Sequence, residues 1–352
     1  MTNTVTDKSN RIYVLDYIKA IAMISVIINH CTLGSHMEKL LLYPYFIGLA
    51  VPFFILISGF TFSLSYHKME TMGIGSWYKK STVLPKLSRF LAPFIVIFPL
   101  EVIYRWGIVG IPFDLYNVVR SFFFGGYGPG SYYVPLLVEM LFVFPLCYVL
   151  IKKYGFKGVL ILVGVQLIFQ VGVYYIDLDT IYYKRIILRY LVFLAGGIYI
   201  YLHQKDILKS KRNIIFLLFS LLIGGIYIYA VNYQGYVPDI FAVWRRTAMP
   251  TILYVFPIMA FFISYFFHKK IPGKFGDLLS LVGQSSYHIF LIQMFWFHIG
   301  WEKTLPYYLA IPLNLALTIT LGILFYKAEN NIRKKLKQRK DTQQKAKIPS
   351  HC

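Results

Sequence analysis

Long apolar runs follow one another along almost the whole chain and are separated by short polar connections. A helix that crosses a bilayer needs about 20 mainly apolar residues, and the runs have about that length. The pattern therefore predicts an all-α, polytopic integral membrane protein with a bundle of about ten transmembrane helices. The expected spans are residues 12–33, 44–65, 87–106, 132–151, 157–176, 186–203, 213–232, 247–267, 278–299 and 305–326, of which 186–203 and 278–299 are the least regular.

One segment, residues 107–131, interrupts this pattern because it is rich in Gly and Pro, with GGYGPG at 125–130. It is expected to be a re-entrant or surface segment whose backbone is covered by protein or water. The expected organisation is a cytoplasmic N-terminal segment (1–11), a transmembrane domain (12–326) and a basic cytoplasmic tail (327–352). The first apolar run is too long for a cleaved signal peptide, so we expect it to remain as the first span.

Composition agrees with a lipid environment. The chain is 57% hydrophobic, 18% aromatic and only 14% charged, whereas a soluble domain carries roughly 25% charged residues. Such a chain has too few polar groups to cover its surface. The aromatic excess is typical of membrane proteins, in which Trp and Tyr gather at both interfaces.

Lys and Arg residues alternate between the two sides of the predicted bundle. The N-terminus, the even-numbered connections and the tail hold 26 of the 36, the other connections hold nine, and Lys19 lies within the first span. Because positive charge marks cytoplasmic loops, the split predicts cytoplasmic termini and an even number of spans. The same distribution explains the net charge of +21 without nucleic acid, and it favours contact of the tail with anionic lipid.

Ionisable residues inside spans are costly and are candidates for function. Lys19 and His30 are eleven residues apart on the first predicted helix, so they point roughly the same way, about 16 Å apart along the axis. Asp16, three residues before Lys19, can be its partner. The unperturbed pKa of imidazole, about 6.5, suits a general base. The alternative for His30 is a hydrogen-bonded histidine packed between helices. The cysteines (Cys31, Cys147 and Cys352) have no metal-ligand spacing, so no metal is expected.

Five segments, in order, resemble the membrane-bound acyltransferase family 3. The first runs from Arg11 to His30, and the fourth contains Tyr132 and Tyr133. The five segments are Arg11–His30, Val51–Phe60 (VPFFILISGF), Lys86–Pro93 (KLSRFLAP), Tyr132–Pro145 and Ser286–Leu291 (SYHIFL).

The resemblance implies a ten-helix O-acyltransferase that moves an acyl group, acetyl or succinyl, from cytoplasmic acyl-CoA to a hydroxyl of an extracytoplasmic glycan. The functional histidine of the family falls on His30. The family's helix-one arginine falls on Lys19, which keeps the charge but loses the bidentate fork. Its late histidine falls on Gln293, which cannot act as a base.

Roles for the candidates follow from the resemblance together with their positions, although Glu139 lies where the family often has an uncharged residue. His30 and Glu139 are expected to be catalytic, with Glu139 either paired with His30 or part of a separate polar network. Lys86 and Arg89 are expected to bind the phosphates of coenzyme A, with Lys19 deeper. Expected substrate-binding residues are Asp16, Tyr132, Tyr133, Arg245 and Arg246. An interfacial belt explains the tyrosines equally well, and snorkelling explains the arginines better.

Two other classes of function stay open at this point. A transporter or flippase for a lipid-linked glycan or small organic acid would also have many spans and buried charges, but the chain shows no inverted repeat. A scaffold for a polysaccharide synthase is the third possibility. The composition, rich in Lys and Ile, suggests the cytoplasmic membrane of a low-GC bacterium. A separate soluble transferase or a polysaccharide synthase is a possible partner.

Overall fold

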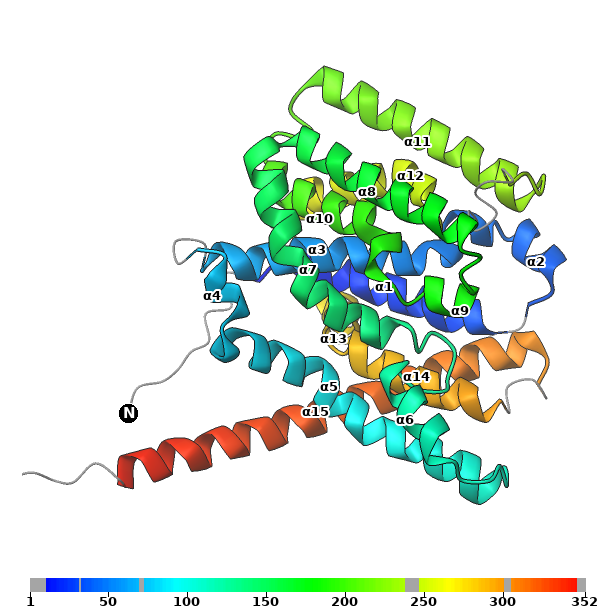
Figure 1. Ribbon diagram of the computed structural model, residues 1–352, viewed down its shortest axis with the longest axis vertical. Helices are drawn as coiled ribbons and strands as arrows, with labels where there is room; N and C mark the ends of the chain where they lie inside the picture. The colour runs from blue at the N-terminus through cyan, green and yellow to red at the C-terminus, as the bar shows by residue number, and fades with distance from the viewer. Residues whose placement is uncertain (1–10, 32, 70–72, 238–246, 301–304, 347–352) are drawn as a thin grey trace, which may run out of the picture.

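The computed structural model describes residues 11–31, 33–69, 73–237, 247–300 and 305–346. These residues form helices and connecting loops, with no β-strand among them. Figure 1 shows the helices gathered into one bundle, with α1 inside it, α11 along one flank and α15 extending away from it.

The longer helices account for most of the bundle. They are α1 (Tyr13–His30), α3 (Ala50–His67), α5 (Lys80–Ile103), α7 (Tyr133–Tyr154), α8 (Phe156–Tyr175), α10 (Leu191–His203), α11 (Lys211–Asn232), α12 (Ile252–Phe266), α13 (Gly273–Gln284), α14 (Ser286–Ile299) and α15 (Tyr307–Ala346). Short helices lie between them: α2 (Ser35–Leu40), η2 (Tyr43–Tyr45), η3 (Ile47–Leu49), α4 (Gly75–Tyr78), η5 (Tyr104–Ile108, a π-helix), α6 (Leu115–Phe123), α9 (Thr180–Tyr183), η6 (Ile187–Tyr190) and η8 (Met249–Thr251).

Each expected span overlaps one helix or helix pair. Within the described residues, eight helices are long and apolar enough to cross a bilayer. The pair Gly273–Gln284 and Ser286–Ile299 passes the same test as one span bent by 68°, and Ile187–His203 is a shorter apolar helix. The polytopic helical fold is thus confirmed, and the two irregular spans are the two that the sequence marks as least regular. The number of crossings stays a prediction.

Small residues let the central helices approach closely. A Cβ atom on Gly59 of α3 would lie 2.4 Å from the Leu194 carbonyl oxygen, and one on Gly197 of α10 would lie 1.9 Å from the Leu56 carbonyl oxygen. Membrane helices associate through such contacts because lipid provides no hydrophobic drive between them. By contrast, α11 turns exposed apolar side chains outward (Ile215, Phe219 and Leu222), as a lipid-facing helix does.

The Gly- and Pro-rich segment at 107–131 folds as a surface element followed by a tight loop. The side chain of Asp114 caps α6 by accepting the Tyr116 N–H at 2.9 Å, the usual role of Asp at this position. None of the residues of α6 is buried. The loop then returns to the bundle at Tyr133, where α7 begins. Of the two arrangements expected for this segment, α6 is the surface one.

Helix α15 continues without a break past residue 326, where the sequence placed the end of the last span. Its 40 residues correspond to about 60 Å at 1.5 Å per residue, about twice the hydrocarbon thickness of a bilayer. Figure 1 shows the final, red part of this helix clear of the bundle. The expected basic tail is therefore helical up to Ala346.

Candidate active site

A cavity of about 870 Å³ lies within the bundle. Residues of α1, η3, α3, α5, α7, α13, α14 and α15 line it, together with the loop before α7 and Thr247. Two of the lining residues are Lys19 and His30, so one space contacts both ends of α1. We refer to the two ends of this space as the Lys19 end and the His30 end.

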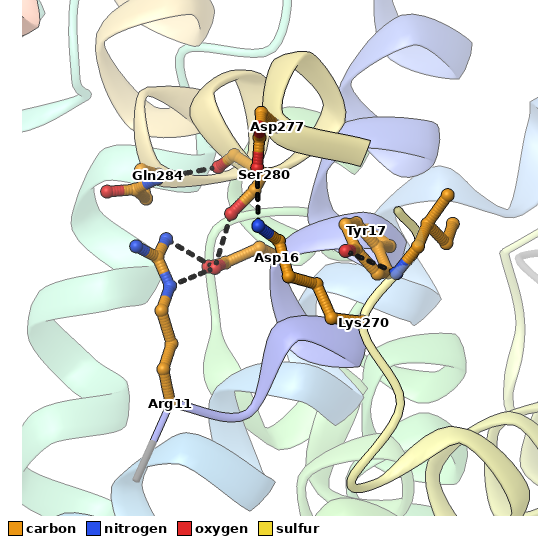
Figure 2. A network of polar contacts seen from close by, with 8 residues as sticks. Arg11, Asp16, Tyr17, Lys270, Asp277, Ser280 and Gln284 are labelled. Carbon is orange, nitrogen blue, oxygen red and sulfur yellow. Dashed lines mark hydrogen bonds and ion pairs between the residues drawn. The ribbon is translucent and has the colours of Figure 1, made fainter. Parts of the chain in front are cut away.

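A polar network fixes the N-terminal end of α1 against α13 (Figure 2). The Asp16 carboxylate accepts from Arg11 Nε at 2.9 Å and Nη2 at 2.6 Å, and from the Ser280 hydroxyl at 3.2 Å. The Tyr17 hydroxyl accepts the Ile271 N–H at 3.0 Å. Nearby, Lys270 and Asp277 form an ion pair at 2.8 Å, and the carboxylate raises the pKa of the Lys270 ammonium.

These contacts change the role expected for Asp16. The sequence suggested Lys19 as its partner, whereas its hydrogen bonds go to Arg11 and Ser280. The charge of Asp16 still acts on Lys19, and both residues line the cavity. A Cβ atom on Gly283 would lie 2.0 Å from the Asp16 carbonyl oxygen, so α13 and α1 touch at this point. Asp16 therefore orients the helix that carries Lys19 and His30.

At the His30 end, the imidazole lies in an aromatic and glycine-lined recess. The His30 and Phe297 ring centroids are 5.8 Å apart, and a Cβ atom on Gly130 would lie 3.9 Å from His30 Nε2. Tyr132 and Tyr133, expected to bind substrate, line the same cavity. The Tyr133 hydroxyl is hydrogen-bonded to that of Ser58. The structure thus brings three of the sequence candidates together here.

At the Lys19 end, a charged cluster joins three helices. His288 of α14 contacts the Glu329 carboxylate of α15. Arg333 donates from Nε to Glu329 Oε1 at 2.6 Å and from Nη2 to the Ser88 carbonyl oxygen of α5 at 2.8 Å. Arg89, a sequence candidate, lines the cavity beside them.

Sequence reasoning missed Glu329 and Arg333 because both fall in the segment assigned to the tail. A signal was present, since Glu and Arg four residues apart pair on one helix face. His288 belongs to the SYHIFL segment of the sequence, and its partner in the structure is Glu329.

Four other candidates lie elsewhere or outside the described residues. Glu139 does not pair with His30: its Oε2 accepts the Ile187 N–H at 2.7 Å, so the alternative, a separate polar network, describes it. Lys86 Nζ lies 4.4 Å from the Trp77 ring centroid, and Lys86 is not among the cavity-lining residues. Arg245 and Arg246 fall outside the described residues.

Gln293, at the position of the late histidine of the family, is fully buried in α14. Neither of its side-chain amide atoms has a hydrogen-bond partner among the described residues. Gln293 does not line the cavity that holds His30. In the described part of the chain, no three His, Cys, Asp or Glu side chains come together as metal ligands would.

The arrangement has the parts that acyl transfer needs. A group that can take a proton lines one end of the cavity, and cations line the other end. Comparison with known proteins points the same way. A family model described as an acyltransferase domain, that of acyltransferase family 3, matches residues 12–333. Curated proteins and solved structures give no match. Because the family model covers nearly the whole chain, the protein belongs to acyltransferase family 3 and is a multi-pass membrane acyltransferase.

Proposed function

We propose that the protein is an O-acyltransferase of a bacterial cytoplasmic membrane. In this proposal it carries an acyl group, acetyl or succinyl, from acyl-CoA in the cytoplasm to a hydroxyl of an extracytoplasmic glycan. The observation that carries the proposal is the single cavity lined by both Lys19 and His30. Their separation of about 16 Å along α1 matches a donor that enters from one side and reacts near the other.

The Lys19 end suits the donor. Coenzyme A carries phosphates, and Lys19 and Arg89 line the cavity at this end. Lys is suited to a phosphate as a point charge, and Arg as a planar fork. Arg333, paired with Glu329 on the same helix, donates to the Ser88 carbonyl oxygen and so joins α15 to α5 at the rim, and the entrance keeps its shape. The pantetheine arm then follows the cavity and brings the thioester close to His30.

The His30 end suits the transfer itself. His30 Nε2 takes the proton of the acceptor hydroxyl while that oxygen attacks the thioester carbonyl carbon. The tetrahedral intermediate collapses as the C–S bond breaks, and the proton on His30 passes to the departing thiolate. The products are the O-acyl ester and free coenzyme A. Tyr132 and Tyr133 present ring faces on which a sugar can rest, because amphipathic aromatic side chains have an apolar body and a polar tip.

The proposal also specifies the surroundings of the reaction. The lipid bilayer surrounds the bundle, and the acceptor arrives from the outer side. A separate soluble transferase or a polysaccharide synthase is a candidate partner that delivers or extends the glycan. Arg245 and Arg246 remain proposed acceptor contacts.

Thioester consumption tests the proposal directly. Purified protein in nanodiscs is given acetyl-CoA or succinyl-CoA, with water in place of the acceptor hydroxyl, so that the acyl group is released by hydrolysis of the donor. Free thiol is followed over time for the wild type and for His30→Ala. His36→Ala is the matched control, because His36 is exposed on the short helix α2. We expect turnover in the wild type and in His36→Ala, with a loss of about 100-fold or more in His30→Ala, as for removal of a general base. Turnover unchanged in His30→Ala would reject the general-base role.

A further inference from the structure

The bundle contains a fully buried carboxylate, Glu101, that the proposed reaction does not use. Glu101 of α5 has no exposed surface, although a charged or polar group in an apolar interior is costly unless it is hydrogen-bonded. Its Oε2 accepts the Tyr127 N–H at 3.0 Å, and the Gly128 N–H also donates to this carboxylate. Its Oε1 has no partner within the described residues. Glu101 thus binds backbone of the loop at residues 125–130.

The loop at residues 125–130 packs tightly against α5 and α14. A Cβ atom on Gly126 would lie 2.6 Å from Glu101 Oε2, and one on Gly128 would lie 2.1 Å from the Met294 carbonyl oxygen of α14. The backbone of Gly126 has φ +112, a conformation that other residues rarely adopt. The loop is therefore held between α5 and α14 by contacts that only glycine allows.

The other end of the loop reaches His30. Gly130 lines the cavity, and a Cβ atom there would lie 3.2 Å from the Phe290 ring and 3.9 Å from His30 Nε2. Only Pro129 separates Gly130 from Gly128, and the Ser131 N–H donates to the Gly128 carbonyl oxygen at 3.2 Å. A shift of the backbone at Tyr127 is therefore transmitted to the wall beside His30.

Arg105 contacts the same loop through the side chain of Tyr127. Its guanidinium lies 4.4 Å from the centroid of the Tyr127 ring, and it follows Glu101 by four residues at the start of the π-helix Tyr104–Ile108. Such irregular turns occur frequently at functional sites. The backbone and the ring of Tyr127 are thus contacted by two residues of one helical segment.

From these contacts we infer that Glu101 is a positioning residue for acyl transfer. It holds the loop at 125–130 in place, and this loop forms the wall that positions the acyl acceptor beside His30. This inference rests on the proposed role of His30. A displacement of about 1 Å in a reacting group can lower the rate by about 100-fold. Glu101 holds the loop through a side-chain oxygen that accepts hydrogen bonds, and not through its negative charge.

Two substitutions distinguish the effect of the hydrogen-bond-accepting oxygen of Glu101 from the effect of side-chain size. Glu101→Gln keeps an oxygen that can accept the Tyr127 N–H, and Glu101→Met fills a similar volume without an acceptor. In nanodiscs with acetyl-CoA, where water takes the place of the acceptor hydroxyl beside His30, we expect kcat for thioester hydrolysis within a few-fold of wild type in Glu101→Gln. In Glu101→Met we expect kcat to fall by about 100-fold, with KM for acetyl-CoA changed only a few-fold. Thermal unfolding verifies that both variants are folded.

A second measurement does not depend on turnover. Diethyl pyrocarbonate modifies accessible imidazoles, and mass spectrometry of peptides reports each histidine separately. We expect modification of His30 to rise several-fold in Glu101→Met but not in Glu101→Gln, while His288, at the opposite end of the cavity, stays unchanged. Unchanged kcat and unchanged labelling of His30 in Glu101→Met would overturn the inference. Equal loss of kcat in Glu101→Gln and Glu101→Met would overturn it too, because charge rather than an acceptor oxygen would then be needed.

The two hypotheses can fail separately. If His30→Ala keeps full turnover, the proposed function of His30 fails, whatever the Glu101 variants do. If His30→Ala is inactive and Glu101→Met retains wild-type kcat, the role of His30 stands and the positioning role of Glu101 is rejected.

Discussion

Lys19 and His30, eleven residues apart on α1, line opposite ends of one cavity. A helix in which both residues faced the same way was expected from a period of 3.6 residues per turn. The structure adds the continuous space between them, which no periodicity can predict. It also shows what fixes the direction of the helix, namely the Asp16 contacts to Arg11 and Ser280.

Replacement of Lys19 should weaken binding of the donor. Lys19→Met removes one cation from the cavity at nearly constant side-chain length, and a hydrogen bond to a charged group contributes about 1.5–3 kcal/mol. We therefore expect KM for acetyl-CoA to rise about tenfold or more, with kcat within a few-fold of wild type. Lys19→Arg, which restores the residue type of the family, should recover wild-type KM or improve on it. Steady-state kinetics in nanodiscs measures both values.

Lys86 provides the matched control for this prediction. Its ammonium lies over the Trp77 ring and not along the cavity. We expect Lys86→Met to change KM for acetyl-CoA by less than Lys19→Met does. The opposite order, with the larger effect at Lys86, would restore the sequence assignment of Lys86 as the main phosphate contact and would contradict the one made from the cavity.

Much of the fold was predictable because lipid imposes a simple rule on sequence. Each span must pair its backbone N–H and C=O groups within the helix and present apolar side chains to lipid. The length and hydropathy of a segment therefore locate the helices. The rule weakens where a helix is bent or covered by protein, and the pair α13–α14 and the short helix Ile187–His203 are the irregular cases. This rule does not apply to the surface helix α6, and only the Gly and Pro residues that flank it within 107–131 indicated an interruption of the pattern.

The site was less predictable, since pairing between distant helices leaves no periodic trace. Nothing in the sequence indicated that Glu139 would accept from the Ile187 backbone instead of contacting His30. Similarly, His288 and Glu329 are 41 residues apart. Lys19 and His30 were found because ionisable residues inside a span are costly, and Tyr132 and Tyr133 because the family resemblance marks their segment. The structure brings all four to one cavity.

A methyl group at Gly197 should destabilise the bundle. Its Cβ would lie 1.9 Å from the Leu56 carbonyl oxygen, so α10 and α3 would have to separate. Overpacking of this kind costs about 1–3 kcal/mol. We expect Gly197→Ala to lower the midpoint of thermal unfolding in detergent. Gly164→Ala on α8 is the control, since nothing lies within 4 Å of a Cβ there, and it should match wild type. Equal midpoints for the two variants would show that the α3–α10 contact can relax.

The pair between Glu329 and Arg333 should contribute measurably to stability. The Glu329 side chain is 16% exposed, and it contacts His288 as well as Arg333. A double-mutant cycle with Glu329→Gln and Arg333→Gln should give a coupling of about 1 kcal/mol, typical of residues in one network. The exposed pair Asp206–Lys209 should give no measurable coupling, because solvent screens such pairs. A coupling at Glu329–Arg333 as small as that of the exposed pair would remove the argument that this cluster shapes the cavity entrance.

The predicted orientation can be tested with the natural cysteines. Cys31 and Cys147 are buried, and Cys352 is the last residue of the chain. A membrane-impermeant maleimide should therefore label Cys352 in inside-out vesicles and not in intact cells, with Cys352→Ser as the unlabelled control. Labelling of Cys352 in intact cells would mean an odd number of crossings, with the basic end of the chain outside.

One further reporter separates ten crossings from eight, a distinction that the chain ends cannot make. In a Cys352→Ser background, Lys39→Cys on α2 should be labelled in intact cells, and Lys205→Cys, directly after the short apolar helix Ile187–His203, should be labelled only in inside-out vesicles. Both positions are exposed. If Ile187–His203 does not cross, position 205 lies outside and is labelled in intact cells. Protection at position 205 together with access at position 39 in intact cells supports a full crossing by this helix. The positive charges at Lys205, Lys209, Lys211 and Arg212 then lie on the cytoplasmic side, as the orientation rule requires.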